Sequence, residues 1–433
     1  MAARIPRLVI AALGWLALTI GRAEAADPPV LDSGGTAWVL TASALVLLMT
    51  LPGLALFYGG LVRARNVLSV LMHCFVIACV VSLLWMAFGY SLVFEEGNPL
   101  LGSLDAAFLG GLRGQLSATG IPEPAVVMFQ MTFAIITPAL IVGAFTERVR
   151  FSFVVLFSAL WMALVYVPVA HWVWGGGWLA DLGTLDFAGG IVVHTTAGVS
   201  ALVAAILVGP RLGFAERLEP PHSPGMTMAG AGMLWVGWFG FNGGSALAAD
   251  GSAASAILAT HFAAAAAGLA WITVEYLRVG KPTSVGIVTG VIAGLATVTP
   301  ASGYVGPLGA AAMGAAGGVL CFFFTSIVKA RFRIDDSLDV FAVHGIGGIL
   351  GTLLVAVFAL PALGGIGFGR DIGMGGQLWA QAVGIAAAVV WSAAWSFVII
   401  KLLAVTVGLR VSVDEQREGL DLSTHGERAY DLA

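Results

Sequence analysis

Two histidines lie inside long apolar segments of this sequence, where an ionisable side chain is uncommon. His194 lies in the segment 189–209 and His344 lies in the segment 339–360. An ionisable residue inside a membrane span is costly, so it usually faces the protein interior or a pore. Imidazole titrates near neutral pH, and its two nitrogens can donate and accept, so two adjacent rings could relay a proton.

Two other interpretations of these histidines stay open from the residues alone. They could be separate core residues, each hydrogen-bonded to its own neighbours. They could also bind a metal ion, but no Cys, Glu or third His stands at metal-ligand spacing from either ring. We therefore expect no metal and no cofactor.

The sequences around the two histidines are weakly similar. Asp186 opens the segment of His194, Asp339 opens the segment of His344, and a glycine follows each histidine by four residues. The spacing from acid to histidine differs between the two. Some transporters consist of inverted repeats related by a pseudo-two-fold axis in the membrane plane. The similarity of the two segments therefore predicts an inverted five-plus-five helix repeat with one span left over. The axis of that repeat would bring the histidines together near the midplane.

The composition indicates an all-α polytopic membrane protein. The chain is 59% hydrophobic and 10% charged, whereas soluble domains carry about 25% charged residues. Its 58 glycines would let helix backbones approach closely in a bilayer. No basic run is dense enough to indicate nucleic-acid binding. The three cysteines all lie in apolar stretches, which disfavours a disulfide framework.

Eleven apolar stretches are long enough to cross a bilayer, which takes about 20 residues. With the N-terminus outside, fifteen Lys and Arg residues fall in cytoplasmic segments, and only Arg113 and Arg370 fall in outer loops. Cytoplasmic loops carry the excess of positive charge, so this separation predicts eleven transmembrane helices, N-out and C-in. The stretches are 36–60, 71–94, 124–145, 151–172, 189–209, 225–247, 254–277, 284–301, 308–329, 339–360 and 378–405.

The two ends of the chain predict three regions. Residues 1–25 are typical of a cleavable signal peptide, because two arginines precede a short apolar core and an Ala-x-Ala cleavage pattern. An uncleaved first helix is the alternative. Residues 26–405 form the predicted transmembrane domain, and 406–433 form a polar cytoplasmic tail with a regulatory role. The signal indicates a multi-pass protein of a bacterial-type inner membrane.

The segment DFAGGIVVHTTAG at 186–198 is similar to the signature of the ammonium transporter family. Further segments that resemble the family's motifs occur in family order from about residue 36 to 430, so chance agreement is negligible. The other matching segments are FYGGLVRARN at 57–66, GAFTER at 143–148, AHWVWGGG at 170–177, GWFGFN at 237–242, FAVHG at 341–345, GLRV at 408–411, EGLD at 418–421 and HGE at 425–427.

The resemblance implies a homotrimer with one pore in each subunit and a defined outer entrance. Trp174, Phe133 and Ser245 match the family's outer site, which recruits ammonium. Phe133 and Phe241 match its stacked gate. The presence of both Trp174 and Ser245 favours the Amt branch over the Rhesus branch of the superfamily.

The resemblance also implies how the pore is lined. His194 and His344 match the family's twin-histidine pair, and Asp186 matches an acid near the entrance whose function is largely structural. Family members of this kind are blocked by trimeric PII-type signal proteins that insert a loop into the inner mouth. A PII-type partner is therefore implied beside membrane lipid. We expect the charged tail, 414–430, to pack under the pore and couple subunits, although a solvated disordered tail is the alternative.

These residue types suit a small cation that carries four N–H donors. An aromatic face attracts cations, and Trp does so most strongly. A Ser hydroxyl can accept one N–H bond. A Trp and a Ser together lack the ring of oxygens with which potassium filters replace the ion's hydration shell. Without the resemblance, Trp174 would be interpreted as an interfacial anchor. The two phenylalanines would be ordinary core aromatics.

We expect selective ammonium transport, with methylammonium as an analogue, and no enzymatic activity. A bare charge is costly in an apolar pore, so ammonium would lose a proton near the gate. Ammonia and the proton would then both reach the cytoplasm, with net charge transferred. Passage of the intact ion, or of ammonia alone, stays open. The alternative function is an ammonium sensor that signals through a PII-type partner. An intramembrane enzyme would need a nucleophile or a metal beside the histidines, and the sequence offers neither. A polyamine transporter would need buried carboxylates, and the apolar stretches are nearly free of them.

Overall fold

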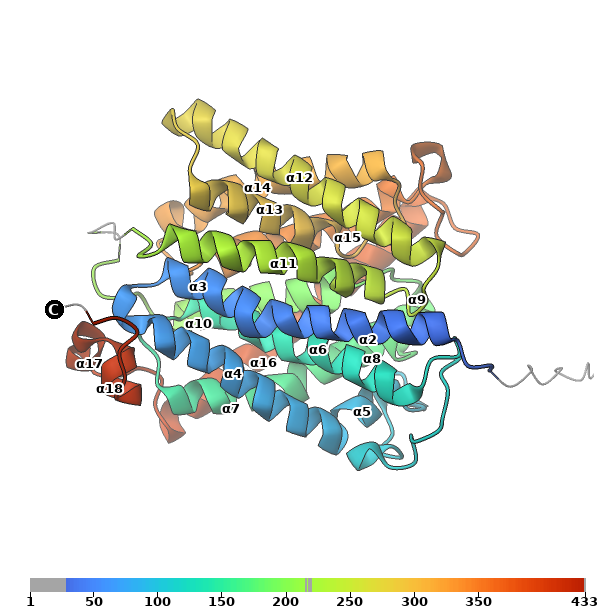
Figure 1. The fold of residues 1–433 in the computed structure, drawn as a ribbon, viewed down its shortest axis with the longest axis horizontal. Coiled ribbons are helices and arrows are strands. Elements are labelled where there is room, and N and C mark those ends of the chain that lie inside the picture. Colours follow the sequence, from blue (N-terminus) through green and yellow to red (C-terminus); the bar gives the residue numbers. More distant parts are fainter. Residues whose placement is uncertain (1–28, 215, 217–219, 432–433) are drawn as a thin grey trace, which may run out of the picture.

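The computed structural model describes residues 29–214, 216 and 220–431, and the predicted signal peptide at 1–25 lies outside this part. The described helices form one elongated bundle in which most run along the long axis (Figure 1). This arrangement confirms the predicted all-α polytopic class in its general form.

Within the described residues, nine helices are long and apolar enough to cross a membrane. Several of them are interrupted by a short π-helical or 3₁₀ turn, so one span can carry more than one helix label. The spans are Ser33–Leu61 (α2, Ser33–Leu48; α3, Ala55–Leu61), Ala64–Phe94 (α4, Val67–Leu84; α5, Tyr90–Phe94), Glu123–Ala144 (α6, Glu123–Ile141), Phe151–Leu182 (α7, Phe151–Trp161; α8, Val167–Trp174; α9, Trp178–Leu182), Gly190–Val208 (α10, Thr196–Val208), Gly251–Val279 (α12), Pro307–Arg331 (α14, Pro307–Ser326), Phe341–Phe358 (α15, Ile346–Phe358) and Met374–Thr406 (α16).

Two further helices occupy the two remaining apolar stretches of the sequence. Helix α11 (Pro224–Gly244) has 21 residues, and many of them are glycines that add little hydropathy. Helix α13 (Ser284–Val298) has only 15 residues. A small antiparallel hairpin, β1 (Gly97–Asn98) with β2 (Leu101–Gly102), connects α5 to α6.

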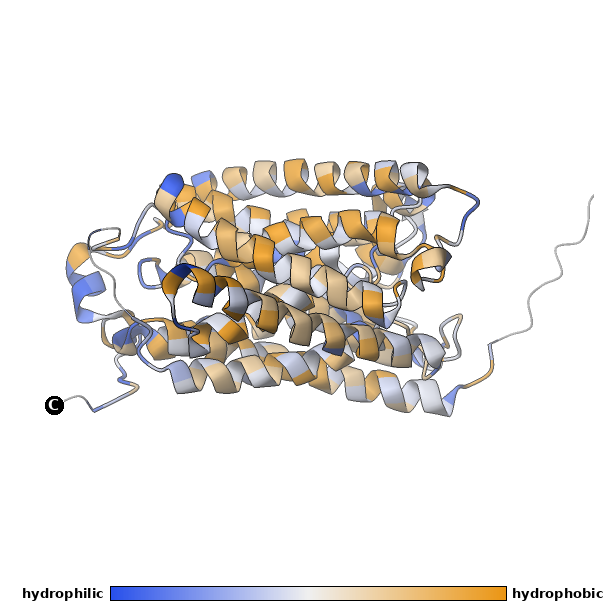
Figure 2. Ribbon diagram, turned by 90° about the horizontal axis from the view of Figure 1, so that it is seen from above, coloured by the Kyte–Doolittle hydropathy of each residue, from blue (hydrophilic) through white to orange (hydrophobic). Residues whose placement is uncertain are grey.

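The described chain begins and finishes at opposite ends of the bundle (Figure 1). Helix α2 begins at what we call the far end. Helices α17 (Val413–Glu418) and α18 (Leu420–His425) lie at what we call the tail end. Hydrophobic residues cover the lengths of the helices, and hydrophilic residues gather at the two ends (Figure 2). This distribution fits helices that cross a bilayer and meet water at both ends.

The two histidine segments are helices that begin inside the protein with a π-helical turn. The turn Gly190–Thr195 contains His194 and leads into α10. The turn Phe341–Gly345 contains His344 and leads into α15. Such turns are rare and are frequently found at functional sites. The two turns contact each other, although their residues are about 150 positions apart in sequence.

The glycine that follows each histidine by four residues packs against the other histidine's turn. A Cβ atom on Gly198 would overlap the backbone of Gly345. A Cβ atom on Gly348 would lie 2.7 Å from the carbonyl oxygen of Gly190 and 2.8 Å from the Cβ of His194. Small residues let helix backbones approach closely in this way. The reciprocal contact explains the paired glycines noticed in the sequence.

We expect Gly198→Ala to destabilise the protein, because the new methyl group would force the two turns apart. Overpacking of this kind costs about 1–3 kcal/mol. The apparent melting temperature of the purified protein in detergent should fall. Gly232→Ala on α11 is the control, since its added Cβ has open space around it. Equal melting temperatures for the two variants would contradict this account of the crossing.

Candidate functional site

The two histidine rings form a hydrogen-bonded pair. Nδ1 of His344 lies 3.2 Å from Nδ1 of His194, and the ring centroids are 5.2 Å apart with the planes inclined by 25°. Both side chains are buried. When both rings are neutral, one Nδ1 must carry the proton and the other must accept it. The pair then presents one Nε2 acceptor and one Nε2 donor. If the acceptor Nε2 gains a proton while the other Nε2 loses one, the shared proton moves between the Nδ1 atoms and the two ends exchange roles with both rings neutral.

The carboxylate of Asp186 fixes the start of the first histidine turn. Each of its oxygens accepts hydrogen bonds from two backbone N–H groups at the beginning of the turn. A carboxylate at a helix N-terminus satisfies otherwise unpaired donors and complements the helix dipole. The bonds run from Gly189 (2.8 Å) and Gly190 (2.6 Å) to Oδ1 and from Ile191 (2.7 Å) and Val192 (3.0 Å) to Oδ2. Asp186 therefore acts on the position of His194 rather than touching it.

The corresponding acid of the second turn is Asp336, which the sequence analysis missed. Its Oδ2 accepts a hydrogen bond of 2.8 Å from the backbone N–H of Phe341, at the start of the turn. Asp336 precedes His344 by eight residues, as Asp186 precedes His194. Asp339, which the sequence analysis paired with Asp186, instead contacts Lys329. The equal spacing was the signal that could have identified Asp336.

The histidine pair lies where two cavities meet. The first, which we call the lumen, is lined by both histidines and otherwise by apolar and aromatic side chains. Its volume is about 10 Å³, close to the minimum that one water molecule needs. The second, which we call the vestibule, has a volume of about 720 Å³ and lies among loops at the tail end. His344 and Phe57 line both cavities. The histidine pair therefore lies at the boundary between the apolar lumen and the wider vestibule.

A stack of aromatic rings covers the other side of the pair. Phe133 and Phe241 are both buried, with ring centroids 4.1 Å apart. Phe241 also lies over His194, at 6.1 Å between centroids. Trp174 meets Phe133 edge to face, at 5.8 Å. The rings therefore form a continuous series from the far end to the histidines.

Trp174 and Ser245 lie at helix ends beside this stack. The indole N–H of Trp174 donates to the backbone carbonyl of Asp186 at 2.8 Å, which holds the ring at the end of α8. Ser245 caps the end of α11, and its hydroxyl donates to the carbonyl of Phe241 at 2.8 Å. Its oxygen lone pairs remain available as acceptors. Among the described residues no hydrogen bond joins Ser245 to Trp174.

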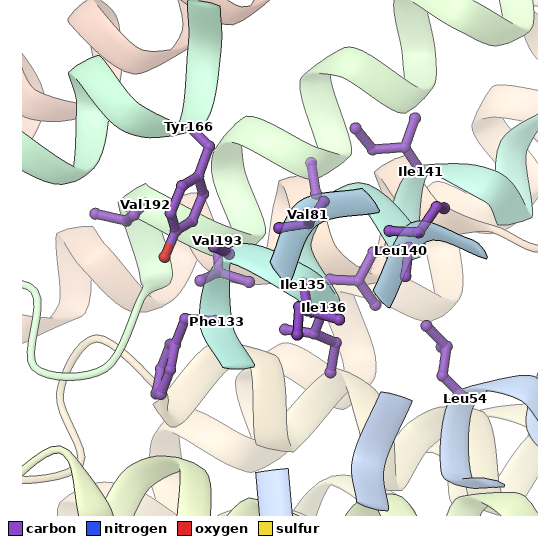
Figure 3. Close-up of a cluster of buried hydrophobic side chains, with 14 of the residues drawn as sticks. Leu54, Val81, Phe133, Ile135, Ile136, Leu140, Ile141, Tyr166, Val192 and Val193 are labelled. Carbon is purple, nitrogen blue, oxygen red and sulfur yellow. The ribbon is translucent and has the colours of Figure 1, made fainter. Parts of the chain in front are cut away.

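Two buried side chains near the stack were also missed by the sequence analysis. Trp238 packs against His194 at 5.5 Å between ring centroids and donates to Thr299. Tyr166 is buried, and Figure 3 shows its hydroxyl oxygen on the side of Val193 and Phe133. That hydroxyl has no hydrogen-bond partner in the structure. Aromatic residues within apolar spans give no sequence signal that separates such positions from ordinary packing.

A buried arginine holds the loops around the vestibule. Arg148 is fully buried and donates to four backbone carbonyls and to the hydroxyl of Ser337. Arg211 forms a bidentate pair with Asp335, at 2.9–3.0 Å. Although burial raises the pKa of Asp335, Arg211 and Arg148 hold that pKa below its usual value. These bonds connect loops that are distant in sequence and so fix the shape of the vestibule.

The tail packs against the bundle instead of extending away from it. The carboxylate of Asp421 accepts hydrogen bonds from the backbone N–H groups of Leu68 and Ser69, at the start of α4. Arg410 donates to the carbonyls of Val208 and Pro210, beside the vestibule. The tail therefore packs against its own chain, and its expected coupling of subunits is untested. Its regulatory role stays a prediction.

Within residues 29–214, 216 and 220–431, no group of three or more His, Cys, Asp or Glu side chains is placed to hold a metal ion.

A small apolar cavity with two histidines, buried in a bundle of apolar helices, suits a polytopic membrane transport protein. Residues 37–430 match the Ammonium Transporter Family, and this chain belongs to that family. The predicted membership is confirmed.

Relatives and solved structures agree over nearly the whole chain. The ammonium transporter of Aquifex aeolicus (strain VF5) is 48% identical over 406 residues, which cover 93% of this chain and 94% of the relative. The ammonium transporter of Bacillus subtilis (strain 168) is 47% identical, covering 92% and 99%. A solved structure described as a sensor Amt protein has a TM-score of 0.85 at 31% identity, covering 90% of this chain and 98% of its own. Candida albicans Mep2 has a TM-score of 0.82 at 34% identity, covering 89% and 88%.

The buried Asp336 predicts a pH-dependent stability. Burial, with the nearby charge of Asp339, raises the pKa of Asp336 to about 7 from an unfolded value near 3.8. Because the pKa is raised in the folded state, the stability that Asp336 contributes is complete below its unfolded-state pKa and is lost as pH rises through about 7. The shift corresponds to about 4 kcal/mol. The apparent melting temperature should therefore fall between pH 5 and pH 8.

Asp336→Asn keeps an oxygen that accepts from Phe341 but does not titrate, so this variant should show a smaller fall. Asp414→Asn is the control, because that side chain in the tail is 94% exposed. If the fall were as steep in Asp336→Asn as in the native protein, the assignment to Asp336 would be wrong.

Proposed function

We propose that this protein conducts ammonium selectively from the far end to the tail end of its lumen. The observation that carries the proposal is the 3.2 Å contact between Nδ1 of His194 and Nδ1 of His344 inside an almost dry cavity. A charged ion pays a large desolvation cost in such a cavity. A neutral molecule that can both donate and accept hydrogen bonds, such as ammonia, passes more easily.

The far end suits capture of the ion before it is dehydrated. Trp174 offers an aromatic face for a cation, and Phe133 stands edge-on beside it. The hydroxyl of Ser245 accepts one N–H bond from the ion. Phe133 and Phe241 form the gate, because their buried rings lie close together, with centroids 4.1 Å apart, and are apolar.

The proton and the ammonia separate at this gate. Ammonia enters the lumen as a neutral molecule, and the proton moves through the histidine pair. Because the pair presents one Nε2 donor and one Nε2 acceptor, it takes a proton at one end as it gives a proton at the other. Both species reach the vestibule, so net charge crosses the membrane.

The same proposal includes the arrangement of the protein in its membrane. The eleven helices of the apolar stretches cross a bacterial-type inner membrane, with the far end outside and the tail end in the cytoplasm. The separation of Lys and Arg between the two sets of loops supports this orientation. Three copies assemble as a homotrimer with one lumen in each. The two histidine turns, with their matching acids and glycines, support an inverted five-plus-five repeat.

The test is the transient current of the purified protein in proteoliposomes after a jump to ammonium, and separately to potassium. Ammonium alone should produce current, with methylammonium as a weaker substitute. Replacing both pair members, His194→Leu with His344→Leu, should abolish the current or its selectivity, since leucine relays no proton. His261→Leu is the matched control, because His261 lies on α12 and lines neither cavity. Normal ammonium-selective current in the double variant would refute the relay.

We also expect Ser245→Ala to weaken capture of the ion. A hydrogen bond to a charged group contributes about 1.5–3 kcal/mol, so the ammonium concentration that gives half-maximal current should rise about tenfold or more. The maximal current should change less, because the lumen is untouched. Ser252→Ala, at an exposed position at the start of α12, is the control. An unchanged half-saturating concentration would remove Ser245 from the capture site.

The second candidate is an ammonium sensor acting through a PII-type partner at the tail end. Its support is the likeness to a solved structure described as a sensor Amt protein and the roomy vestibule among ordered loops. A sensor would bind ammonium without producing either current or a change of internal pH in the vesicles. Both assays on the same preparation therefore separate the two functions.

A further inference from the structure

Both ring nitrogens of His171, a buried residue in the last turn of α8, contact backbone carbonyl oxygens. Nδ1 lies 2.8 Å from the carbonyl oxygen of Val93, and Nε2 lies 2.9 Å from the carbonyl oxygen of Asn98. A backbone carbonyl oxygen accepts hydrogen bonds and cannot donate one. Both nitrogens of the ring must therefore be the donors.

Only one protonation state of an imidazole ring can make these two bonds. A neutral ring carries one N–H donor, and its other nitrogen is an acceptor. Either neutral tautomer of His171 would point a nitrogen lone pair at a carbonyl oxygen within hydrogen-bond distance. The imidazolium form carries a proton on both nitrogens and makes both bonds, so the geometry fits a cation.

Two helix ends at this position stabilise a positive charge. Val93 lies in the last turn of the helical span Ala64–Phe94, where carbonyl groups lack partners within the helix. His171 lies in the last turn of α8. The C-terminus of a helix is the negative end of its dipole, so both ends favour a cation at the ring. Hydrogen bonds from a charged donor are also about twice as strong as those between neutral groups.

Acidic side chains are not the partners of this histidine. Tyr90, the ionisable residue of α5, contacts Glu123 instead. In the part of the chain that the structure describes, the ring's polar contacts are the two carbonyls, and no ionisable side chain of the neighbouring elements bonds to it. The ionisable residues on or beside the elements that pack against α8 are Tyr90, Glu95, Glu96, Tyr166, Asp181 and His194.

The bond to Asn98 is one of three that tie the β1–β2 hairpin to the corner between α8 and α9. Nε1 of Trp172 donates to the carbonyl of Leu100 at 3.0 Å, and the backbone N–H of Trp178 donates to the carbonyl of Pro99 at 3.1 Å. Three successive carbonyls at the tip of the hairpin therefore accept bonds from this corner. The tip itself is exposed, so water reaches the ring when the hairpin opens.

The same corner carries the aromatic face of the capture site. Trp174 is the last residue of α8, and the backbone N–H groups of Gly175 and Gly177 both donate to the carbonyl of His171 at 3.0 Å. A Cβ atom on Gly175 would overlap the carbonyl oxygen of Val93, so the ends of α5 and α8 are in direct contact. A displacement of His171 would therefore also displace Trp174.

We propose that His171 is held as an imidazolium cation and is a positioning residue for the outer capture site. This inference rests on the proposed transport function, to which the capture site belongs. While the ring carries both protons, it clamps the hairpin to α8 and fixes the place of Trp174. When the ring loses a proton at alkaline pH, a bare nitrogen faces a carbonyl oxygen, the clamp opens and Trp174 is no longer fixed.

The first experiment measures the charge of His171 directly. In protein with isotope-labelled imidazole nitrogens in lipid vesicles, solid-state NMR resolves protonated ring nitrogens from bare ones. At neutral pH, the signals that disappear in His171→Gln should come from two protonated nitrogens. Disappearance of a bare-nitrogen signal would show a neutral ring and overturn the proposal.

The second experiment measures the clamp in the native protein, so it does not depend on the folding of a variant. Hydrogen–deuterium exchange of the hairpin and of the α8–α9 corner is followed by mass spectrometry, and each rate is divided by that of the unfolded peptide at the same pH. Protection should fall about tenfold from neutral to alkaline pH, because a hydrogen bond from a charged group is lost. Constant protection would overturn the clamp.

Two variants separate the charge of the ring from simple loosening of the hairpin. His171→Gln has no charge and keeps at most one of the two bonds, so its protection should be low at both pH values. Trp172→Phe removes the bond to Leu100 but keeps the histidine. Its protection should be lower than in the native protein and should still fall with pH.

The role in capture is measured by the ammonium current at different pH values, with the concentration counted as the ion alone. The half-saturating concentration of the native protein should rise about tenfold from neutral to alkaline pH. In His171→Gln it should be high at both pH values, whereas Trp172→Phe should keep the native dependence. Equal pH dependence in the native protein and in His171→Gln would overturn the positioning role.

These measurements separate the inference from the function on which it rests. A neutral His171 in a protein with normal ammonium current would overturn the inference alone. Absence of ammonium current in native protein whose His171 is charged and whose hairpin is protected would overturn the proposed transport, and the role in capture with it.

Discussion

The contact between the two imidazole rings is the constraint on which the rest of the structure depends. Two polar rings can hydrogen-bond at 3.2 Å inside an apolar lumen only if the chains that carry them approach closely from opposite halves of the sequence. The glycines at 198 and 348 remove the side chains that would prevent this approach. The π-helical turns begin each helix inside the protein, so that the rings meet at depth.

A helix that begins inside a bilayer leaves backbone N–H groups without partners, and water is absent there to satisfy them. Two carboxylates supply the acceptors that these N–H groups need. Asp186 accepts four N–H bonds at the first turn, and Asp336 accepts the N–H of Phe341 at the second. Each carboxylate is thereby used by the backbone. The lumen stays free of fixed negative charge, which would otherwise hold a cation inside it.

The sequence was sufficient for the features that depend on composition and period. Long apolar stretches predicted the helices, and the histidines within them identified the pair that the structure brings together. The sequence was insufficient where the conformation of a loop determines the hydrogen-bond and ion-pair partners of a side chain. Asp335, Asp336 and Asp339 stand within five residues, yet one pairs with an arginine, one caps a helix and one contacts a lysine. Only the eight-residue spacing to the histidine sets Asp336 apart. The pairing of Asp186 with Asp339 followed the start of the apolar segment instead, and it failed.

The two ends of the lumen solve opposite problems, and their chemistry differs accordingly. In the proposed transport an ion is attracted and loses its water at the far end, where the structure places aromatic faces, a hydroxyl and a carboxylate saturated by backbone donors. On the same proposal an ion re-forms at the tail end, in a wider space, and departs. Several of the charges there are paired, as Arg211 is with Asp335 and Lys329 is with Asp339. A paired charge orders the loops that shape the vestibule without binding the ion strongly, so release need not be slower than entry.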